Sequence, residues 1–294
     1  MFTGCNALLP NEIGPAEALP ISPRNPRGAN VGYQTESLTS GRFTMFTVPF
    51  NHVSNDGKGL MLGTDIQFEN IYGDEEYSYV KSDQCRIWNG LNGYDIFFYF
   101  PGYTADPADP EDEDMAAGWY HFTEDTLFAE TEGFENGLKE GQSIYFKAVT
   151  GEGKTATGSG AVESEPEYEV PLTSGRFTMY GNPYPVATFL NDKDSVEFVN
   201  IYGDEEYSYV KSDQCRIWNG LNGYDIFFYF PGYTADPADP EDEDMAAGWY
   251  HFTEDTLFEE TEGFENGLKP GSAIYFKAVE GAGKKMIFKS PLAK

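Results

Sequence analysis

The sequence predicts an all-β protein built from two tandem, homologous domains, each a β-sandwich or a small β-barrel. Three observations support this. Residues 70–139 recur at 200–269 without a gap, and only Ala129 against Glu259 differs. Short runs of aromatic and β-branched residues alternate with Gly, Asn, Asp and Pro, as in many short strands joined by turns. The chain of 294 residues is long enough for two domains that each bury a core.

The repeat sets the domain organisation. LTSGRFTM at 38–45 recurs at 172–179, and IYFKAV at 144–149 recurs at 274–279. The unit is therefore domain-sized rather than solenoid-sized. We assign 1–28 to an N-terminal Pro-rich arm, 29–160 to repeat 1 and 161–294 to repeat 2. The joint is placed in the Gly-, Thr-, Ser- and Glu-rich stretch 151–167. Identity that extends over surface positions indicates recent duplication, so it is not evidence of functional constraint.

The expected strands of repeat 1 follow from their residue types. In chain order they are RFTMFTVPF at 42–50, EYSYVK at 76–81, QCRIW at 84–88, YDIFFYF at 94–100, GWYHF at 118–122 and SIYFKAV at 143–149. In 94–100 large apolar residues occupy both faces, which indicates a strand covered on both sides. In 84–88 the residue Cys85 shares a face with Ile87, so we expect a small buried hydrophobe there.

The connections are also predicted. Two Asn-Gly pairs in 89–93 indicate a hairpin between 84–88 and 94–100. Glu140 before Gly141 becomes Pro270 before Gly271 in the second copy, which fits the first corner of a type II turn. The one helical candidate, 130–138, is interrupted by glycines and would be short.

The formal net charge of −30 excludes some classes of function. It opposes binding to nucleic acid, and we expect no nucleic-acid partner. No apolar run of about 18 residues exists, so we expect no membrane-spanning segment. Phe2-Thr3-Gly4-Cys5 is similar to the end of a bacterial lipobox, which would make Cys5 a lipid anchor. The alternative is a chance cysteine in a loose arm.

The loop 101–122 carries most of the distinctive charge. Six carboxylates fall within 106–114, and the second copy repeats them. Residues 70–139 hold 16 acidic residues against Lys81, Arg86 and Lys139, a net charge of −13. Calcium prefers 6–8 oxygen ligands, so the candidate calcium ligands are Asp106, Asp109, Glu111, Asp112 and Asp114, with Asp236, Asp239, Glu241, Asp242 and Asp244. The EF-hand spacing is absent, and the alternative is a solvated, self-repelling loop.

Exposed aromatic rings can stack on sugars. The candidates for such a ligand site are Trp88, Trp119 and Tyr120, with their copies Trp218, Trp249 and Tyr250. The alternative is that these rings pack in the core or between the domains.

Support for catalysis is thin, and we expect no enzyme. His121 and its copy His251 should alternate out of a strand, and neither a nucleophile elbow nor an H-E-x-x-H motif occurs. Gly153-Lys154-Thr155 resembles the end of a P-loop but lacks its first glycine, so we interpret it as linker.

A resemblance adds to these patterns. Gly175-Arg176-Phe177, 181-GNPYP-185, 217-IWNG-220 and the run 270–277 resemble uncharacterised Gly- and aromatic-rich β domains of secreted or surface proteins of bacteria. Repeat 1 departs from this pattern at 47–50. The resemblance implies export and a structural or surface role. We therefore expect a non-enzymatic extracellular or cell-surface protein, structural or adhesive, that self-associates. The alternative is a pair of carbohydrate-binding modules assisted by calcium.

Overall fold

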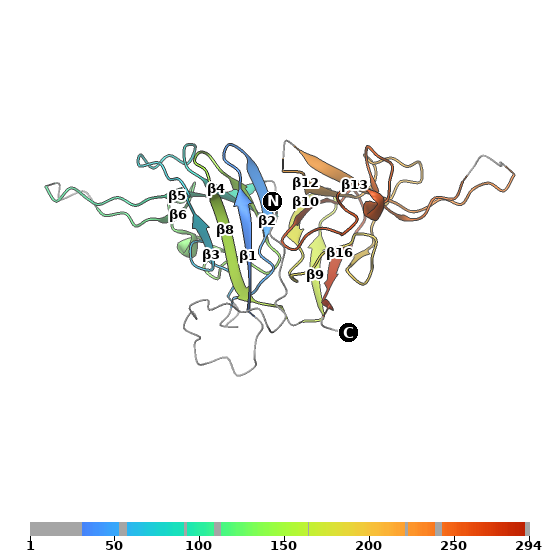
Figure 1. The fold of residues 1–294 in the computed structure, drawn as a ribbon, viewed down its shortest axis with the longest axis horizontal. Coiled ribbons are helices and arrows are strands. Elements are labelled where there is room, and N and C mark those ends of the chain that lie inside the picture. Colours follow the sequence, from blue (N-terminus) through green and yellow to red (C-terminus); the bar gives the residue numbers. More distant parts are fainter. Residues whose placement is uncertain are drawn as a thin grey trace.

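The computed structural model describes residues 31–52, 58–90, 93–108, 113–163, 165–220, 223–238 and 243–291. Cys5 and the rest of 1–28 lie outside these ranges. The predicted all-β fold is confirmed: sixteen strands form four antiparallel sheets in two similar pairs (Figure 1). Two short 3₁₀ helices, η1 (Phe128–Glu130) and η2 (Phe258–Glu260), are the helical elements in the described part of the chain.

Repeat 1 contains a three-stranded and a five-stranded sheet. The three-stranded sheet has the order β1-β8-β3, and the five-stranded sheet has the order β2-β7-β4-β5-β6. The strands are β1 (Val31–Leu38), β2 (Phe43–Thr47), β3 (Ile66–Glu69), β4 (Gln84–Trp88), β5 (Tyr94–Phe100), β6 (Gly118–His121), β7 (Ser143–Lys147) and β8 (Lys154–Ala161). β4 and β5 form the predicted hairpin, with Cys85 opposite Phe97.

Repeat 2 has the same topology. Its sheets have the orders β11-β16-β9 and β10-β15-β12-β13-β14. The strands are β9 (Glu167–Leu172), β10 (Phe177–Gly181), β11 (Val196–Val199), β12 (Gln214–Trp218), β13 (Tyr224–Phe230), β14 (Gly248–His251), β15 (Ala273–Lys277) and β16 (Lys284–Lys289). The chain passes from one pair of sheets to the other between Ala161 and Glu167.

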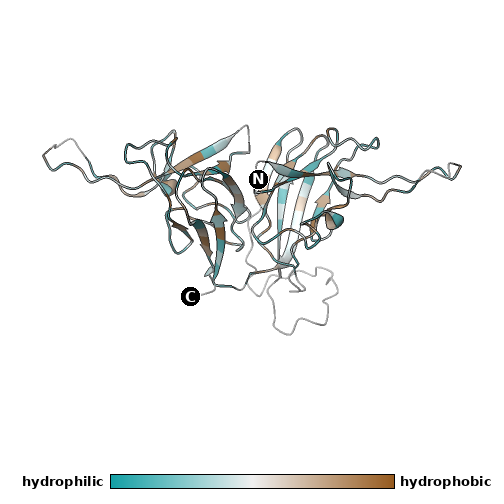
Figure 2. Cartoon of the chain, turned by 180° about the vertical axis from the view of Figure 1, so that it is seen from behind, coloured by the Kyte–Doolittle hydropathy of each residue, from teal (hydrophilic) through white to brown (hydrophobic). Residues whose placement is uncertain are grey.

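Each repeat has its own hydrophobic core between its two sheets. The core of repeat 1 includes Phe46, Ile66, Cys85, Phe97 and Phe146, and its described buried members all lie between Leu38 and Ala156. The core of repeat 2 is built from the equivalent residues of its own strands. Hydrophobic residues accordingly concentrate on the strands of both units (Figure 2). The other face of β5 is also covered, because Phe98 and Phe100 pack with Tyr120 in a second cluster.

The predicted strand at 76–81 is wrong, because this segment forms consecutive turns. Tyr77 has a positive φ of 58°, and its ring packs edge-on against Phe98 and Phe100. The backbone N–H of Asp74 is satisfied by the Ser82 hydroxyl instead of by a neighbouring strand. The apolar residues here cover the outer face of β5 rather than extend a sheet.

The interpretation of 151–155 as linker is also wrong, because Lys154 begins β8, the central strand of the three-stranded sheet. This strand consists of small and hydroxyl residues because the opposite layer comes very close. A Cβ on Gly158 would lie 2.4 Å from Cγ1 of Val48. In repeat 2 the equivalent strand β16 carries Met286 and Phe288, both fully buried. In repeat 1 the space next to this strand is thus filled from the opposite layer, whereas in repeat 2 the side chains of the strand itself fill it.

The two repeats pack through the outer faces of their five-stranded sheets, and the contacts come in equivalent pairs. The Thr47 N–H donates to the Gly271 carbonyl at 2.7 Å, and the Gly181 N–H donates to the Gly141 carbonyl at 2.8 Å. Arg42 donates to the Gly220 carbonyl, as Arg176 does to the Gly90 carbonyl, both at 3.3 Å. Met45 and Met179 lie buried in the apolar cluster between the repeats. Such mutual pairing is the geometry of an isologous two-fold interface.

In the described part of the chain, no helix has the length and apolar character needed to cross a membrane.

Candidate functional site

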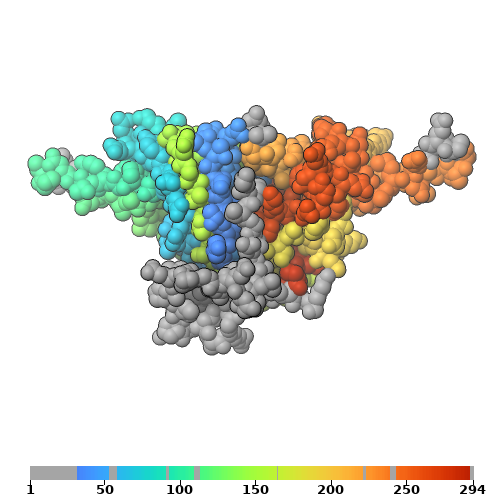
Figure 3. Space-filling model, in the orientation of Figure 1, coloured from blue at the N-terminus to red at the C-terminus, as the bar shows by residue number. Residues whose placement is uncertain are grey.

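The most prominent feature of the molecule is a pair of acidic arms, which we define as 101–117 and 231–247. Their described parts extend from the two sandwiches at opposite ends of the long axis (Figures 1 and 3). Tyr103 and Met115 pair across the first arm, and Tyr233 and Met245 pair across the second. Asp106 and Glu113 are exposed, as are their copies. The arms therefore carry their charge away from the body of the protein.

Four of the ten calcium candidates lie in the described parts of the arms: Asp106, Asp114, Asp236 and Asp244. Asp114 accepts a hydrogen bond across the arm from the Ala105 N–H at 2.8 Å, and Asp106 accepts one from the Ala108 N–H at 2.9 Å. These bonds stiffen the hairpin. The other six candidates lie outside the described residues: Asp109, Glu111, Asp112, Asp239, Glu241 and Asp242. Among the residues that are described, no group of three His, Cys, Asp or Glu side chains is placed to hold a metal ion.

Four of the six aromatic candidates are buried in the sandwiches. Trp119 and Tyr120 are 3% and 6% exposed, and Trp249 and Tyr250 are 1% and 6% exposed. Tyr120 packs against Tyr77, whereas Trp119 packs on the core side against Phe68. These rings therefore do not form a flat, solvent-exposed stacking surface.

The other two aromatic candidates, Trp88 and Trp218, lie between the repeats. Trp88 meets Tyr275 edge-on with ring centroids 5.9 Å apart, and Trp218 meets Tyr145 in the same way at 5.7 Å. The Trp218 indole N–H donates to the Phe43 carbonyl at 3.0 Å. Both tryptophans thus help to join the repeats, as the alternative interpretation of the sequence allowed.

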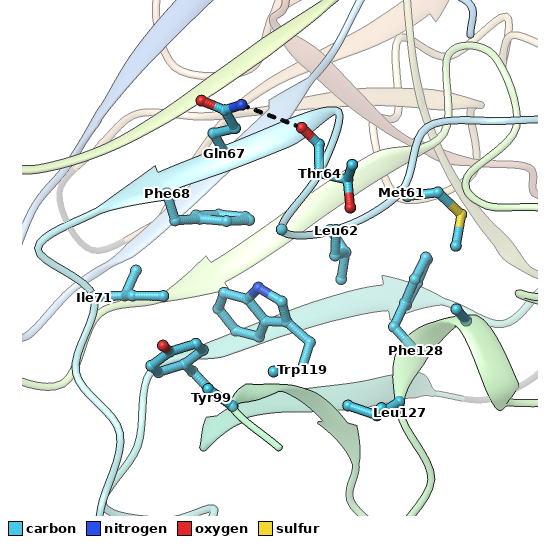
Figure 4. A pocket seen from close by; sticks show the side chains of 14 residues that line it. Met61, Leu62, Thr64, Gln67, Phe68, Ile71, Tyr99, Trp119, Leu127 and Phe128 are labelled. Carbon is cyan, nitrogen blue, oxygen red and sulfur yellow. Dashed lines mark hydrogen bonds between the residues drawn. The ribbon is translucent and has the colours of Figure 1, made fainter. Parts of the chain in front are cut away.

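A cavity of about 570 Å³ opens beside β6 of repeat 1 (Figure 4). Trp119 lies at its centre, with Phe68, Ile71 and Tyr99 to one side and Met61 and Phe128 to the other. Thr64 and Gln67 supply polar side chains at the rim. The pairing of residues from β3, β5, β6 and η1 around one space was not visible from the sequence.

The single difference between the 70-residue blocks lies at this place. Ala129 lines the cavity of repeat 1. Its counterpart Glu259 accepts hydrogen bonds from the backbone N–H and the side-chain Nδ2 of Asn191, at 3.2 and 2.8 Å. Asn191 in turn lies against β14, where its Oδ1 accepts the Trp249 N–H at 2.7 Å. The two otherwise identical blocks therefore differ in what covers the edge strand, which is β6 in repeat 1 and β14 in repeat 2.

The paired histidines and cysteines of the two repeats, His121, His251, Cys85 and Cys215, are all buried. The prediction that His121 alternates out of its strand is wrong: His121 and His251 are each 7% exposed, and the His121 ring packs against Phe97. Cys85 and Cys215 are free and buried, as predicted. Burial raises the pKa of both thiols well above the ordinary value, which leaves them protonated and unreactive.

A buried ion pair in each repeat was missed by the sequence reasoning. Lys154 pairs with Asp83, and Lys284 pairs with Asp213, with all four side chains inaccessible to solvent. Asp83 also accepts the backbone N–H groups of Tyr72 and Val149 at 2.7 Å each. Lys154 donates a second hydrogen bond to the Asn70 carbonyl. These bonds compensate both buried charges and tie β8 to the loop before β4, so we assign the pair a structural role.

A carboxyl pair lies close to the junction of the repeats. Burial, followed by a hydrogen bond to Glu163, raises the pKa of Glu140 to about 7. The Glu140 carbonyl accepts the Tyr168 hydroxyl of repeat 2 at 3.0 Å. The turn that holds Glu140 has the predicted form, since Gly141 has a φ of 68° and the Gln142 N–H bonds to the Lys139 carbonyl. Nothing in the sequence marks Glu140 as a neighbour of Glu163.

No protein-family model matches this chain, and no curated protein or solved structure matches it either.

Proposed function

We propose that this chain is a non-enzymatic structural or adhesive protein of the cell surface or extracellular space, and that it associates through its two acidic arms. The proposal rests on the position of the arms, which extend from opposite ends of a molecule whose two repeats are joined by hydrogen bonds. Two contact elements on one rigid body bind a repeating surface more strongly than one, because the second contact is intramolecular.

Divalent cations would couple the arms of neighbouring molecules. Exposed carboxylates on two approaching arms repel each other, and monovalent salt screens this repulsion over about 8–10 Å. Calcium takes 6–8 oxygen ligands in flexible geometry, so one ion can bridge carboxylates of two arms. Each molecule then has one bridging position at each end, which permits linear assembly.

Light scattering with and without calcium tests this proposal. The arm-neutral variant replaces Asp by Asn and Glu by Gln at all six carboxylates of each arm, namely Asp106, Asp109, Glu111, Asp112, Glu113, Asp114, Asp236, Asp239, Glu241, Asp242, Glu243 and Asp244. The charge-matched control makes twelve Glu→Gln changes at exposed positions outside the arms, namely Glu75, Glu124, Glu130, Glu132, Glu135, Glu152, Glu205, Glu254, Glu260, Glu262, Glu265 and Glu280.

The wild type and the control should form larger species when calcium is added, and chelator should reverse the change. The arm-neutral variant should stay at the mass of one chain. Equal behaviour of the arm-neutral variant and the control would reject the arms as the contact elements. A wild type that stays monomeric at every calcium concentration would reject association through them.

A further inference from the structure

The cavity of repeat 1 contains a backbone donor without an acceptor. β6 is the edge strand of its sheet, and Trp119 stands opposite Tyr99 of β5. The Tyr99 N–H donates to the Asp83 carbonyl on the β4 side at 3.0 Å. Because hydrogen-bonded and non-hydrogen-bonded pairs alternate in an antiparallel ladder, Trp119 directs its own N–H away from β5. No described residue accepts that N–H, although Trp119 is 97% buried.

Repeat 2 shows what satisfies the same donor. The Trp249 N–H donates to the side-chain carbonyl of Asn191, and Glu259 holds Asn191 in place. In repeat 1 the segment that leads into the first buried residue of β3 spans 60–66, two residues fewer than the equivalent 188–196 of repeat 2. With this shorter segment and with Ala129 in place of glutamate, no amide side chain among the described residues of repeat 1 accepts the Trp119 N–H. The Gln67 amide at the rim donates to the Thr64 carbonyl. A buried N–H is costly to leave unpaired, so a ligand carbonyl that accepts it gains affinity.

We propose that the repeat 1 cavity binds a small ligand carrying a neutral amide, whose carbonyl oxygen accepts the Trp119 N–H as Asn191 Oδ1 accepts that of Trp249. The amide is neutral because the strongly acidic chain disfavours a carboxylate ligand. The apolar remainder of the ligand packs against Trp119, Tyr99 and Phe68. The cavity of about 570 Å³ falls within the range of small-molecule sites, about 300–1,000 Å³. This inference does not depend on association through the arms.

Two sources offer this chemistry: an acetamido sugar and an amide of a peptide. The probes are therefore N-acetylglucosamine and N-acetyl-asparagine amide, with glucose as a sugar that lacks the amide. The full chain, labelled with ¹⁵N, is titrated with each probe, and the backbone amide resonance of Trp119 is followed. We expect a saturable shift with at least one amide probe and none with glucose. The probe that acts identifies the source.

The chain supplies a matched pair of variants. Ala129→Glu gives repeat 1 the residue of repeat 2 and places a larger, charged side chain in the lining of the cavity. It should weaken binding about tenfold or more, which corresponds to about 1.4 kcal/mol. Glu259→Ala makes the opposite change in repeat 2 and should leave the Trp119 titration unchanged. Met61→Trp fills the cavity without adding charge and should also abolish binding, which keeps the test decisive if Ala129→Glu fails to fold.

Three results would overturn the proposal. In the first, neither amide probe shifts the Trp119 resonance. In the second, glucose shifts it as strongly as N-acetylglucosamine does. In the third, folded Ala129→Glu or Met61→Trp protein binds like the wild type.

Discussion

The side chains of Lys154 and Asp83 in repeat 1 form an ion pair that is completely removed from water. Each has several hydrogen-bond partners, so the charges are compensated rather than merely adjacent. Removing one member leaves the other charge buried without its partner, which is much more costly than losing an exposed ion pair. The pair therefore fixes how β8 meets the loop before β4.

Lys154→Met should destabilise repeat 1 by about 3–5 kcal/mol, because the Asp83 charge remains buried. Urea unfolding followed by tryptophan fluorescence measures the change. Lys285→Met is the control, because the ion pair of Lys285 with Glu169 is exposed to solvent and its loss should cost no more than about 1 kcal/mol. Superimposable unfolding curves for the two variants would contradict this account of the pair.

Glu140 should make stability depend on pH. Its pKa in the folded protein is raised from 4.5 to about 7, first by burial and then by Glu163. The folded state thus holds this proton more tightly than the unfolded state does. The stabilisation is complete below about 4.5 and is lost as the pH rises through about 7. The melting temperature of the wild type should fall over that interval.

Glu140→Gln, which cannot ionise, should reduce that fall. The exposed Glu132→Gln removes the same charge and serves as the control, since repulsion across the acidic chain also grows with pH. If both variants show the same pH profile of melting temperature, Glu140 is not the group responsible.

At the scale of single elements, the equivalent strands β8 and β16 carry side chains of very different size at the same position in the fold. Gly158 of β8 faces Val48, whereas the equivalent Phe288 of β16 fills the layer by itself. The filled volume between the two layers is therefore conserved, although in repeat 1 a residue of the opposite layer fills it and in repeat 2 a residue of the strand itself does. Dense packing requires such compensation, since interiors tolerate neither voids nor overlap.

Gly158→Val should destabilise repeat 1 by about 1–3 kcal/mol, the usual cost of overpacking, because the new Cβ overlaps the Val48 side chain. Adding Val48→Ala should recover part of the loss by making space. Thermal melting of the single and double variants measures both effects. A double variant less stable than Gly158→Val alone would show that Val48 is not the residue in the way.

The strands show which parts of the fold could be predicted. β4 and β5 begin and end at the predicted residues, because their aromatic and branched side chains are packed within their own sheet. β8 could not be found, because its small residues become buried only when Val48 closes over them. The segment 76–81 was misjudged for the converse reason, since its aromatic residues pack on a sheet that they do not join.

The candidate sites follow the same division. The arms could be predicted as acidic connections because their charge is contiguous in the chain. The partners of Trp88 and Trp218 could not, because each lies in the other repeat. The cavity of repeat 1 could not be predicted either. It becomes apparent only when the segment 60–66 is compared with the longer 188–196 at the same edge strand, and this comparison requires the fold. Among sequence signals, the Ala129 to Glu259 difference could have directed attention there.

At the scale of the whole molecule, the interface between the repeats resembles that of a homodimer. Its backbone and arginine hydrogen bonds occur in equivalent pairs around an apolar centre that contains Met45 and Met179, whereas the Trp218 indole bond to the Phe43 carbonyl has no counterpart at the Trp88 indole. A self-complementary surface of this kind pairs with any copy of itself. The two repeats should therefore remain associated without the covalent link between them.

A protease site inserted at position 164, between the sheets of the two repeats, tests this expectation. After cleavage the halves should elute together from a sizing column, because the interface holds them. Met45→Asp combined with Met179→Asp places two charges in the apolar centre and should separate the cleaved halves. Halves that separate with the wild-type interface would show that the link, and not the interface, joins the repeats.

Association through two opposed arms has a defined valence, and a one-armed protein measures it most directly. This variant carries Asp→Asn and Glu→Gln changes at Asp236, Asp239, Glu241, Asp242, Glu243 and Asp244. Its control carries Glu→Gln changes at Glu205, Glu254, Glu260, Glu262, Glu265 and Glu280. Light scattering in calcium should show the control growing beyond dimers. The one-armed variant should stop at two chains. Growth of the one-armed variant to the size of the control would contradict the account.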